Sequence, residues 1–583
     1  MCGIGGYVDP RGILDGSRVL SRLAAALAHR GPDGEGFFTA GGFGLAHRRL
    51  AIIDLSEGAA QPMRVGPITV VYNGEIYNYR ELRDELRAAG QTFTGASDTE
   101  VLARAYLQWG ATFARRLRGM WAFAIFDERT YSLVCARDPF GIKPFYHCRK
   151  QGAFLFASEP QALLRAGMSP HANLATAAQY LAFGLSDLGR DSFFRYIQQL
   201  NAGETIVVDA QGVLSVIDTL DACTVPPGSA TAAEFAQCLE ESIRLHLRSD
   251  VPVGTCLSGG LDSSTVAALA SAAVRANGGP RFAAVTAASG DPRTDEREYA
   301  AAVAKHCDLD WHLIAPSSTE FVAEIDDCLR AQGEPALSPS VYLQYRVMRE
   351  ARAAGLKVML DGQGADELLC GYERYAPLWA MSVKRESGTL KALGEFTRVA
   401  RNTRPGLGGM VKLAAYVLSP SLRRRVIGAR TNFLRAEFSA GILEVVSRIT
   451  RASQELRSAR AADIRDFSLP ALLRFEDRNS MAHSIEARVP YVDKGVASCA
   501  LRIADRQLLQ QGFTKYPLRT VAARVLPASI AWRGSKVGFE PPSERWLGAL
   551  RERMQQQVNS STLLLRLCRQ VRPLHALPLA MQW

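Results

Sequence analysis

The run Ser258-Gly259-Gly260-Leu261-Asp262-Ser263-Ser264 decides the architecture of the second half of this chain. It follows an apolar stretch at 251–257 and precedes an alanine-rich stretch, so we infer a strand, a glycine turn and a helix in that order. Such a turn directs backbone N–H groups and a helix N-terminus toward an anion, and its serine hydroxyl groups add donors. It is not a Walker A loop, because the Gly-Lys-Ser/Thr ending is absent.

Strands and helices alternate on both sides of this loop. A helix is predicted at 232–247, a strand at 281–286 and a helix at 298–306. This alternation favours an α/β domain with a parallel sheet. From about residue 375 onward the pattern is mainly helical and arginine-rich.

The first half of the chain has a different pattern, rich in short strands. Strands are predicted at 68–72, 121–126, 131–136 and 205–208, and helices at 79–89 and 99–109. The sequence T-V-P-P-G-S-A-T at 224–231 interrupts every periodic pattern. We therefore predict a first domain at 1–208, a linker at 209–231 and a second domain at 232–583.

Composition excludes several classes of protein. The 583 residues are 47% hydrophobic and 22% charged, which is ordinary for globular proteins, and the length suggests two or three domains. The net charge of +11 is spread along the chain, so anionic substrates explain it and nucleic-acid binding is not expected. The eleven cysteines contain no C-x-x-C pair, and no apolar run approaches the roughly 18 residues of a membrane span. We expect a cytoplasmic protein without a zinc site, a disulfide framework or a membrane partner.

The chain begins Met1-Cys2-Gly3-Ile4-Gly5-Gly6. Removal of Met1 would make Cys2 the N-terminal residue, so that a thiol and an α-amine share one residue. The pKa of a free α-amino group is about 7.7 to 8.0, and such an amine can take the thiol proton as a general base. A nucleophile served in this way needs no catalytic histidine.

Four further motifs follow Cys2, and their order and spacing carry a resemblance. They are His29-Arg30-Gly31-Pro32-Asp33, His47-Arg48-Arg49-Leu50, Asn73-Gly74-Glu75-Ile76-Tyr77-Asn78 and Ser97-Asp98. Roughly the first 200 residues closely resemble class II glutamine amidotransferases, which implies an N-terminal nucleophile domain with an αββα sandwich. The resemblance implies that Cys2 is the nucleophile and that Asn73 and the backbone of Gly74 form the oxyanion hole. It also implies a glutamine-binding set made of Arg49, Leu50, Asn73, Gly74, Glu75 and Asp98, in which Arg49 holds the α-carboxylate while Glu75 and Asp98 face the α-ammonium group.

Each of these residues also has a structural explanation. Asn73-Gly74 is a common hairpin turn, residues 97–100 have the spacing of a helix capping box, and Arg49 could pair with a surface acid. His29 and His47 are expected to be structural. The ordered set, rather than any single residue, favours a function.

The glycine loop at 258–264 resembles the S-G-G-x-D-S loop of ATP pyrophosphatases, and residues 360–367 resemble the equivalent segment of asparagine synthetases. The combined resemblance is to glutamine-hydrolysing asparagine synthetases, and it implies an α/β adenylating domain that uses ATP and Mg²⁺. The nucleotide-binding residues that it implies are Leu257, Ser258, Gly259, Gly260, Asp262, Ser263, Ser264, Asp361 and Gly362. Asp262 and Asp366 would be Mg²⁺ ligands. The segment 533–539 resembles the family's R-x-x-K-x-G-F motif, which would place the catalytic Lys536 near the phosphates.

One position departs from the family pattern. Some asparagine synthetases have a glutamate where this chain has Gln363, which cannot titrate, so Glu367 is the substitute that the sequence offers for proton transfer. The acceptor carboxylate also stays open. Aspartate is the default, and sugar uronates, cell-wall precursors and natural-product acids are the alternatives; the sequence Gln332-Gly333-Glu334-Pro335 and the arginine-rich segment 423–460 motivate them.

The predicted function is glutamine-hydrolysing, ATP-dependent amidation of a carboxylate through an acyl-adenylate. Phosphoribosyl-pyrophosphate and glucosamine-phosphate amidotransferases would lack the loop at 258–264, and β-lactam synthetases have lost the nucleophile that Cys2 supplies here. A non-catalytic sensor of glutamine or nucleotide is the alternative from another class. The resemblance also suggests a homodimer, which is common in the family.

Overall fold

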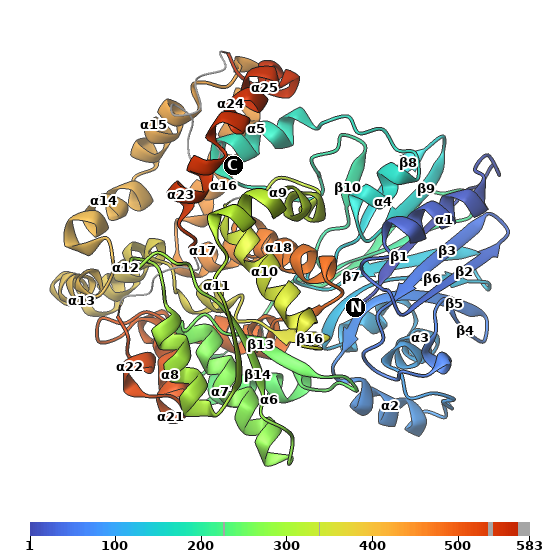
Figure 1. The fold of residues 1–583 in the computed structure, drawn as a ribbon, viewed down its shortest axis with the longest axis horizontal. Helices are drawn as coiled ribbons and strands as arrows, with labels where there is room; N and C mark the ends of the chain where they lie inside the picture. The colour runs from blue at the N-terminus through green and yellow to red at the C-terminus, as the bar shows by residue number, and fades with distance from the viewer. Residues whose placement is uncertain (226–227, 337, 535–539, 570–583) are drawn as a thin grey trace.

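The computed structural model describes residues 1–583 except 226–227, 337, 535–539 and 570–583. The predicted catalytic Lys536 lies outside the described residues. Figure 1 shows two bodies, one built on antiparallel strands from the first part of the chain and one built on a parallel sheet from the rest.

Two antiparallel sheets form the N-terminal body. The first has the order β10-β8-β9-β1-β3-β2 and the second the order β12-β11-β7-β6-β5-β4. The strands of the first sheet are β1 (Gly3–Val8), β2 (Gly34–Ala40), β3 (Phe43–Arg49), β8 (Tyr146–Lys150), β9 (Ala153–Ala157) and β10 (Ile197–Gln199). Those of the second are β4 (Met63–Val65), β5 (Ile68–Ile76), β6 (Gly119–Asp127), β7 (Ser132–Arg137), β11 (Glu204–Val208) and β12 (Leu214–Thr219).

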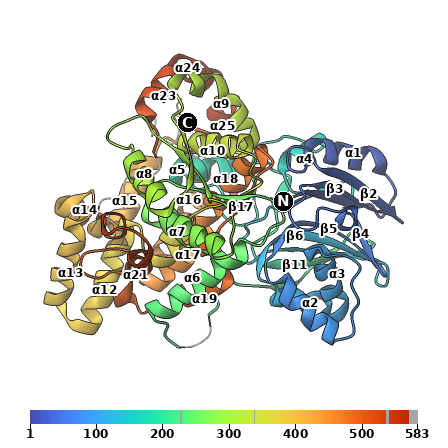
Figure 2. The same ribbon diagram turned by 60° about the horizontal axis from the view of Figure 1, so that its bottom comes forward.

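The two sheets pack face to face and helices cover their outer faces. Ile4 and Phe156 of the first sheet share one buried apolar cluster with Val71 and Phe126 of the second, because alternate side chains of each strand point inward. Figure 2 shows one pair of helices above the sandwich and another pair below it. These are α1 (Gly16–Ala26) and α4 (Pro160–Arg165) on the first sheet, and α2 (Tyr79–Ala88) and α3 (Asp98–Trp109) on the second. The predicted αββα sandwich is confirmed.

The segment 209–231, which the sequence predicted to be a linker, contains a strand. β12 pairs antiparallel with β11 and so extends the second sheet of the N-terminal body. The division into domains at 208 and 232 stays a prediction.

A parallel sheet organises the second body, in the order β15-β14-β13-β16-β17. Its strands are β13 (Val253–Cys256), β14 (Ala283–Ala287), β15 (Asp310–Ile314), β16 (Val358–Leu360) and β17 (Glu486–Arg488). Val266 and Val303 belong to a different buried cluster from Phe321 and Val347, so helices cover both faces of the sheet. These helices are α6 (Ala232–His246), α7 (Leu261–Ala276) and α8 (Arg297–Cys307), and α9 (Ser318–Gln332), α10 (Ser340–Ala353) and α18 (Leu469–Ala482). The predicted α/β domain is confirmed.

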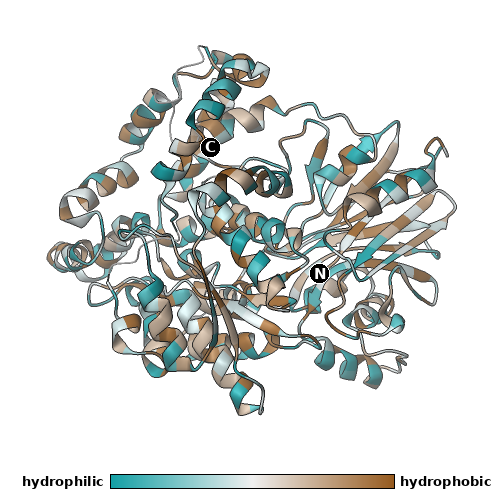
Figure 3. Cartoon of the chain, in the orientation of Figure 1, coloured by the Kyte–Doolittle hydropathy of each residue, from teal (hydrophilic) through white to brown (hydrophobic). Residues whose placement is uncertain are grey.

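The rest of the second body is helical, as predicted (Figure 1). Its principal helices are α11 (Ala365–Leu369), α12 (Ala376–Ser387), α13 (Thr389–Arg401), α14 (Gly406–Leu418), α15 (Pro420–Thr431), α16 (Ser439–Ala452), α17 (Leu456–Ala462), α19 (Lys494–Arg502), α20 (Asp505–Leu508), α21 (Tyr516–Val525), α22 (Ala528–Ala531), α23 (Ser543–Ala549), α24 (Arg551–Ser560) and α25 (Thr562–Leu567). Figure 3 shows hydrophobic residues along the central strands and hydrophilic ones on outer helices such as α2. Within the described part of the chain, none of the helices has both the length and the apolar character needed to cross a membrane.

Buried ion pairs join the two bodies. The guanidinium of Arg30 donates two hydrogen bonds to Asp477 of α18, at 2.8 and 2.9 Å, and both side chains are buried. Arg118 makes the same bidentate contact with Asp493, at 2.8 and 2.9 Å. Paired geometry of this kind fixes orientation as well as distance.

Candidate active sites

Cys2 lies at the boundary of the two bodies, just before β1. Its backbone N–H donates to Oδ1 of Asn73 at 2.9 Å, and its carbonyl accepts from Nε of Arg30 at 3.1 Å. Burial raises the pKa of the Cys2 thiol, although the N-terminal ammonium group and the Leu50 N–H oppose this effect. The thiol therefore needs a base before it can act as a nucleophile. Met1 precedes Cys2 in the structure, and its terminal ammonium group is buried against Oε2 of Glu486 at 2.9 Å.

Asn73 and Gly74 lie inside strand β5, paired with Ala122 and Trp121 of β6. The hairpin-turn explanation for these two residues is therefore wrong. A Cβ atom at position 74 would lie 2.1 Å from the Met120 carbonyl oxygen, so only glycine fits. The Nδ2 atom of Asn73 is buried and has no hydrogen-bond partner among the described residues. A buried donor without an acceptor is what an oxyanion hole requires before substrate binds.

The residues predicted to bind and hydrolyse glutamine converge on one cavity. Cys2, Arg49, Leu50, Gly74, Glu75 and Asp98 all line it, while Asn73 contacts Cys2 from the adjoining strand. Arg49 ends β3 and donates to the carbonyl oxygens of Ser56 at 3.0 Å and Asp54 at 2.5 Å, so a loop holds its guanidinium in place.

The two carboxyl groups of this cavity, those of Asp98 and Glu75, have raised pKa values. Asp98 accepts hydrogen bonds from the Tyr72 hydroxyl and the Ile76 N–H, both at 3.0 Å, and burial raises the pKa of its carboxyl group to about 6. Burial, with Glu486 and Asp98 nearby, raises the pKa of Glu75 well above its ordinary value. Both groups thus favour a cationic ligand that would compensate their charge.

The structural explanations hold for some of the motif residues. Ser97 caps α3 by accepting from the Glu100 N–H, so this turn serves the helix as well as presenting Asp98. His29 contacts Glu159 at 3.1 Å, and His47 contacts the Tyr72 carbonyl oxygen at 3.3 Å. Neither histidine lines the cavity.

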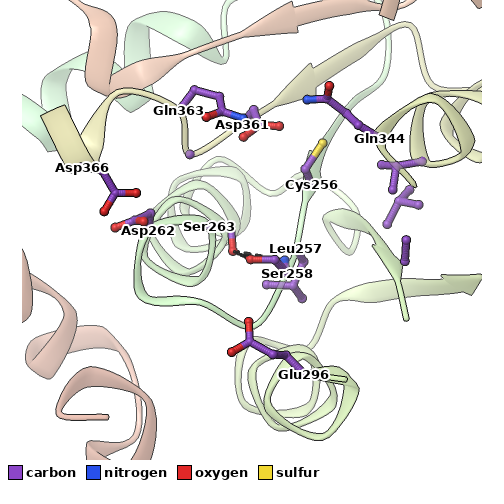
Figure 4. A pocket seen from close by; sticks show the side chains of 14 residues that line it. Cys256, Leu257, Ser258, Asp262, Ser263, Glu296, Gln344, Asp361, Gln363 and Asp366 are labelled. Atoms are coloured by element: carbon purple, nitrogen blue, oxygen red, sulfur yellow. Dashed lines mark hydrogen bonds between the residues drawn. The ribbon is translucent and has the colours of Figure 1, made fainter. Parts of the chain in front are cut away.

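A second cavity, of about 180 Å³, opens at the carboxyl ends of β13 and β16 (Figure 4). Seven of the residues predicted to bind the nucleotide or Mg²⁺ line it: Leu257, Ser258, Asp262, Ser263, Asp361, Gly362 and Asp366. Gly259, Gly260 and Ser264 do not line it: the two glycines form the turn, and Ser264 is buried in the first turn of α7. At Gly259, φ is +79° and a Cβ would lie 2.8 Å from the Ala300 nitrogen, so the turn needs glycine there. The hydroxyl groups of Ser258 and Ser263 are 2.9 Å apart.

Lys515 is a residue of this site that the sequence did not reveal. Its Nζ lies 2.8 and 2.7 Å from the two carboxylate oxygens of Asp262 and also forms an ion pair with Asp366. Only 4% of its side chain is exposed. Lys515 precedes α21, far along the chain from both aspartates, so no local spacing connects the three residues. Its only local signal is its position before a Tyr-Pro helix start.

Family models match both halves of the chain. The asparagine synthase model matches residues 234–577, and the glutamine amidotransferase domain model matches residues 1–216. The chain belongs to the asparagine synthase family. The predicted resemblance is confirmed.

Curated relatives span nearly the whole chain. Asparagine synthetase [glutamine-hydrolyzing] 1 of Bacillus subtilis is 29% identical over 94% of this chain and 88% of its own length. A putative asparagine synthetase [glutamine-hydrolyzing] of Mycobacterium tuberculosis is 32% identical over 94% of this chain and 89% of its own. Asparagine synthetase B [glutamine-hydrolyzing] of Escherichia coli is 28% identical over 97% of this chain and 86% of its own.

The residues that raised questions in the sequence, Gln363, Glu367 and Glu334, lie in three different surroundings. Gln363 lines the second cavity (Figure 4), whereas Glu367 is fully buried outside its lining, where it accepts from the hydroxyl groups of Tyr372 and Ser468. Glu334 accepts from the Tyr146 hydroxyl at 3.0 Å and the Phe193 N–H at 3.1 Å. The glutamate of the 332–335 segment therefore joins the two bodies.

Three arginines of segment 423–460 make hydrogen bonds within the protein. Arg423 donates to the Val417 carbonyl, Arg460 to the carbonyls of Leu368 and Ala500, and Arg448 to Asp466. A further cavity borders this segment and is lined mainly by apolar side chains, with Arg374 and Arg430 as its arginines. The arginine cluster around one large anion that the sequence suggested stays a prediction.

Proposed function

We propose that this protein hydrolyses glutamine at Cys2 and uses the ammonia to amidate a carboxylate that ATP has converted to an acyl-adenylate. The single observation that carries the proposal is the pairing of the two cavities. One holds the Cys2 thiol near the Asn73 amide, whose Nδ2 has no acceptor among the described residues. The other holds a glycine loop of the kind that binds anions, beside Lys515 and two carboxylates. Buried contacts of Arg30 join the backbone of Cys2 to α18 of the second body.

In the glutaminase site, each side chain has a chemical task. The α-amine of Cys2, once Met1 is removed, takes the thiol proton. Nδ2 of Asn73 and the N–H of Gly74 stabilise the oxyanion, while Arg49 binds the glutamine carboxylate and Glu75 and Asp98 bind its ammonium group.

In the synthetase site, Asp262 and Asp366 are the proposed Mg²⁺ ligands. Mg²⁺ is usually bound by one or two carboxylates together with substrate phosphates, and these two aspartates already converge on one cation, Lys515. Mg²⁺ there would neutralise charge on the triphosphate. Lys515, and Lys536 by its motif, would stabilise the departing pyrophosphate.

The test is a coupled assay of glutamate, amide, AMP and pyrophosphate. Asp262→Asn and Asp366→Asn should weaken the use of Mg-ATP while free glutamine hydrolysis persists. Formation of ADP and orthophosphate would instead indicate an acyl-phosphate route. Binding of glutamine and ATP without any turnover would favour the non-catalytic sensor.

Aspartate is the default acceptor, and an acceptor set wider than aspartate is the second candidate. Two observations favour the wider set: Gln363 lines the cavity in place of an acid, and a mainly apolar cavity borders segment 423–460. Acceptor-dependent pyrophosphate release across aspartate, uronates and peptide acids decides between them. Stimulation by aspartate alone, at a KM within roughly 1 μM to 1 mM, would exclude the wider set.

A further inference from the structure

Arg488, a residue of the second body, lies against the carboxylate of Glu75 without lining the glutamine cavity. It ends β17, which lies beside the N-terminus at the boundary of the two bodies (Figure 2). Its side chain is fully buried, and Nη2 of its guanidinium lies 3.7 Å from Oε1 of Glu75. Glu75 lines the cavity, whereas Arg488 does not. The guanidinium therefore approaches this carboxylate from outside the space available to glutamine.

The five N–H groups of Arg488 are used unevenly. Nε donates to Oε1 of Glu486 at 2.6 Å, and Nη1 donates to the carbonyl oxygens of His246 at 2.6 Å and Arg248 at 2.7 Å. These three contacts fix the orientation of the planar guanidinium. Nη2, which carries the other two N–H groups, has no hydrogen-bond partner among the described residues. The guanidinium is thus held with two unused donors next to Glu75.

An arginine that only joins the two bodies uses its donors differently. In Arg118, Nε and Nη2 donate to Asp493 and Nη1 donates to Glu241, so carboxylates occupy all three nitrogens. At Arg488, the unpartnered Nη2 faces Glu75, and Oε2 of Glu75 is buried and also without a partner in the described part of the chain. Unmatched buried groups cost stability. This arrangement therefore points to a role in binding rather than in joining the bodies.

Groups from several elements act on the charge of Glu75. Burial, with Glu486 and Asp98 nearby, raises its pKa well above the ordinary value, and the Arg488 guanidinium and the terminal ammonium group oppose this shift. The titratable and charged groups that face Glu75 are Cys2, Tyr72, Tyr77, Asp98, Glu486, Arg488 and the terminal ammonium group. Glutamine would add an ammonium group, whose best partner is an ionised carboxylate. Arg488 is a fixed cation that favours this ionised form.

We propose that Arg488 is a positioning residue of the glutaminase site, which holds the Glu75 carboxylate ionised and in place for the α-ammonium group of glutamine. The inference rests on the proposed function, in which Glu75 binds that group. The glutamine site is then incomplete without a residue of the second body. Arg488 acts on the binding of glutamine and not on the attack of the Cys2 thiol.

The test measures KM and kcat for glutamine hydrolysis without ATP or acceptor. A cation within about 4 to 6 Å lowers the pKa of a carboxyl group by about 1 to 3 units. Arg488→Met should therefore raise KM about tenfold or more at pH 7.5 and leave kcat nearly unchanged. The excess in KM over the wild type should be greatest at pH 6.5 and shrink toward pH 8.5, because a higher pH restores the ionised carboxylate. Amide synthesis from ammonium shows that the variant is folded.

Two comparisons separate this role from a structural one. Arg118→Met is the matched control, because it breaks an ion pair between the bodies that lies outside the cavity lining, and it should keep the wild-type KM. In a Glu75→Gln background, Arg488→Met should raise KM little further, because the carboxylate on which Arg488 acts is absent. Arg488→Lys keeps a cation and should raise KM less than Arg488→Met does. The same double-mutant cycle with Arg488→Lys decides the question if Arg488→Met does not fold.

Three results would overturn the inference. They are a KM that Arg488→Met leaves unchanged, an equal rise in KM from Arg118→Met, and effects of the Arg488 and Glu75 substitutions that add fully. Absence of glutamine hydrolysis in the wild type would instead refute the proposed function.

Discussion

The two sites handle buried charge in opposite ways. The Cys2 cavity leaves polar atoms uncompensated: Nδ2 of Asn73 and Oε2 of Glu75 have no partner in the described part of the chain, and burial raises the pKa of Asp98 to about 6. In the second cavity, Lys515 bridges the carboxylates of Asp262 and Asp366. The first site holds donors and acceptors in position at a cost in stability, and the second keeps its charges neutralised before substrate arrives.

This difference predicts that mutations in the two sites change stability in opposite directions. Removing a charged or polar group from the Cys2 cavity should reduce activity while leaving stability equal or higher. Removing Lys515 should reduce both, because a buried ion pair that loses one partner leaves an uncompensated charge. The four predictions below test this contrast, from the largest expected effect to the smallest.

Cys2→Ala should abolish glutamine-dependent amide synthesis, by on the order of 10³-fold or more, because the nucleophile is lost. Amide synthesis from added ammonium salts should continue, since the second cavity is chemically separate. Both rates are measured in one amide assay with glutamine or ammonium as nitrogen donor. If a folded, ATP-binding variant lost both activities, the two cavities would not divide the work as proposed.

Lys515→Met should slow acceptor-dependent pyrophosphate release by about 10²- to 10³-fold, because it removes a cation from the proposed phosphate site. It should also lower the thermal midpoint of unfolding, since Asp262 and Asp366 then lose the buried cation that they share. Lys494→Met is the matched control, because Lys494 is exposed and its ammonium group donates to the carbonyl oxygen of Arg115. Equal effects of the two substitutions would contradict the contrast.

The fold and most of the first site could be predicted from sequence because their residues lie in contiguous patterns. The Asn73-Gly74 motif sits on one strand, and the Ser97-Asp98 motif starts one helix, so local spacing already contains the geometry. The predicted strand at 68–72 was too short, because pairing with β6 continues the strand to Ile76. Strand β12 escaped prediction because its outward residues are exposed and it depends on β11 for pairing.

The second site could be predicted only where it is local. The loop at 258–264 and the segment 360–367 were found as motifs, but Lys515 reaches Asp262 from 253 positions away. Long-range ion pairs are tertiary properties that spacing alone does not encode.

Asn73→Ala should lower the rate of glutamine hydrolysis by about 10²- to 10³-fold, corresponding to loss of one oxyanion donor. Stability should change little, because the substitution removes an unpartnered buried amide together with the acceptor of the Cys2 N–H. Asn78→Ala is the control, since Asn78 contacts the backbone of Arg116 and Arg118 instead. Measurement of kcat with glutamine alone separates this effect from the second site. A variant with normal kcat would show that Asn73 is structural.

Asp98→Asn should stabilise the protein at pH 7.5 while it weakens glutamine binding. The folded-state pKa of about 6 lies above the ordinary value of 3.8, so the carboxyl group favours folding below the unfolded pKa and loses that contribution as the pH rises through 6. At pH 7.5 the ionised group opposes folding, and each unit of pKa shift corresponds to about 1.4 kcal/mol. Asparagine removes this penalty, so the free energy of unfolding should rise by about 1 to 2 kcal/mol once the lost hydrogen bonding is allowed for. The Tyr72 hydroxyl and the Ile76 N–H both donate to one oxygen, which the asparagine carbonyl can replace. Unfolding in urea at pH 7.5 and pH 4 measures this change in stability, which should vanish at the lower pH. The KM for glutamine should rise about tenfold or more at pH 7.5, because the ammonium group of glutamine loses a charged partner. A variant less stable than the wild type at pH 7.5 would mean that Asp98 is compensated in the folded protein, and the contrast with Lys515 would fail.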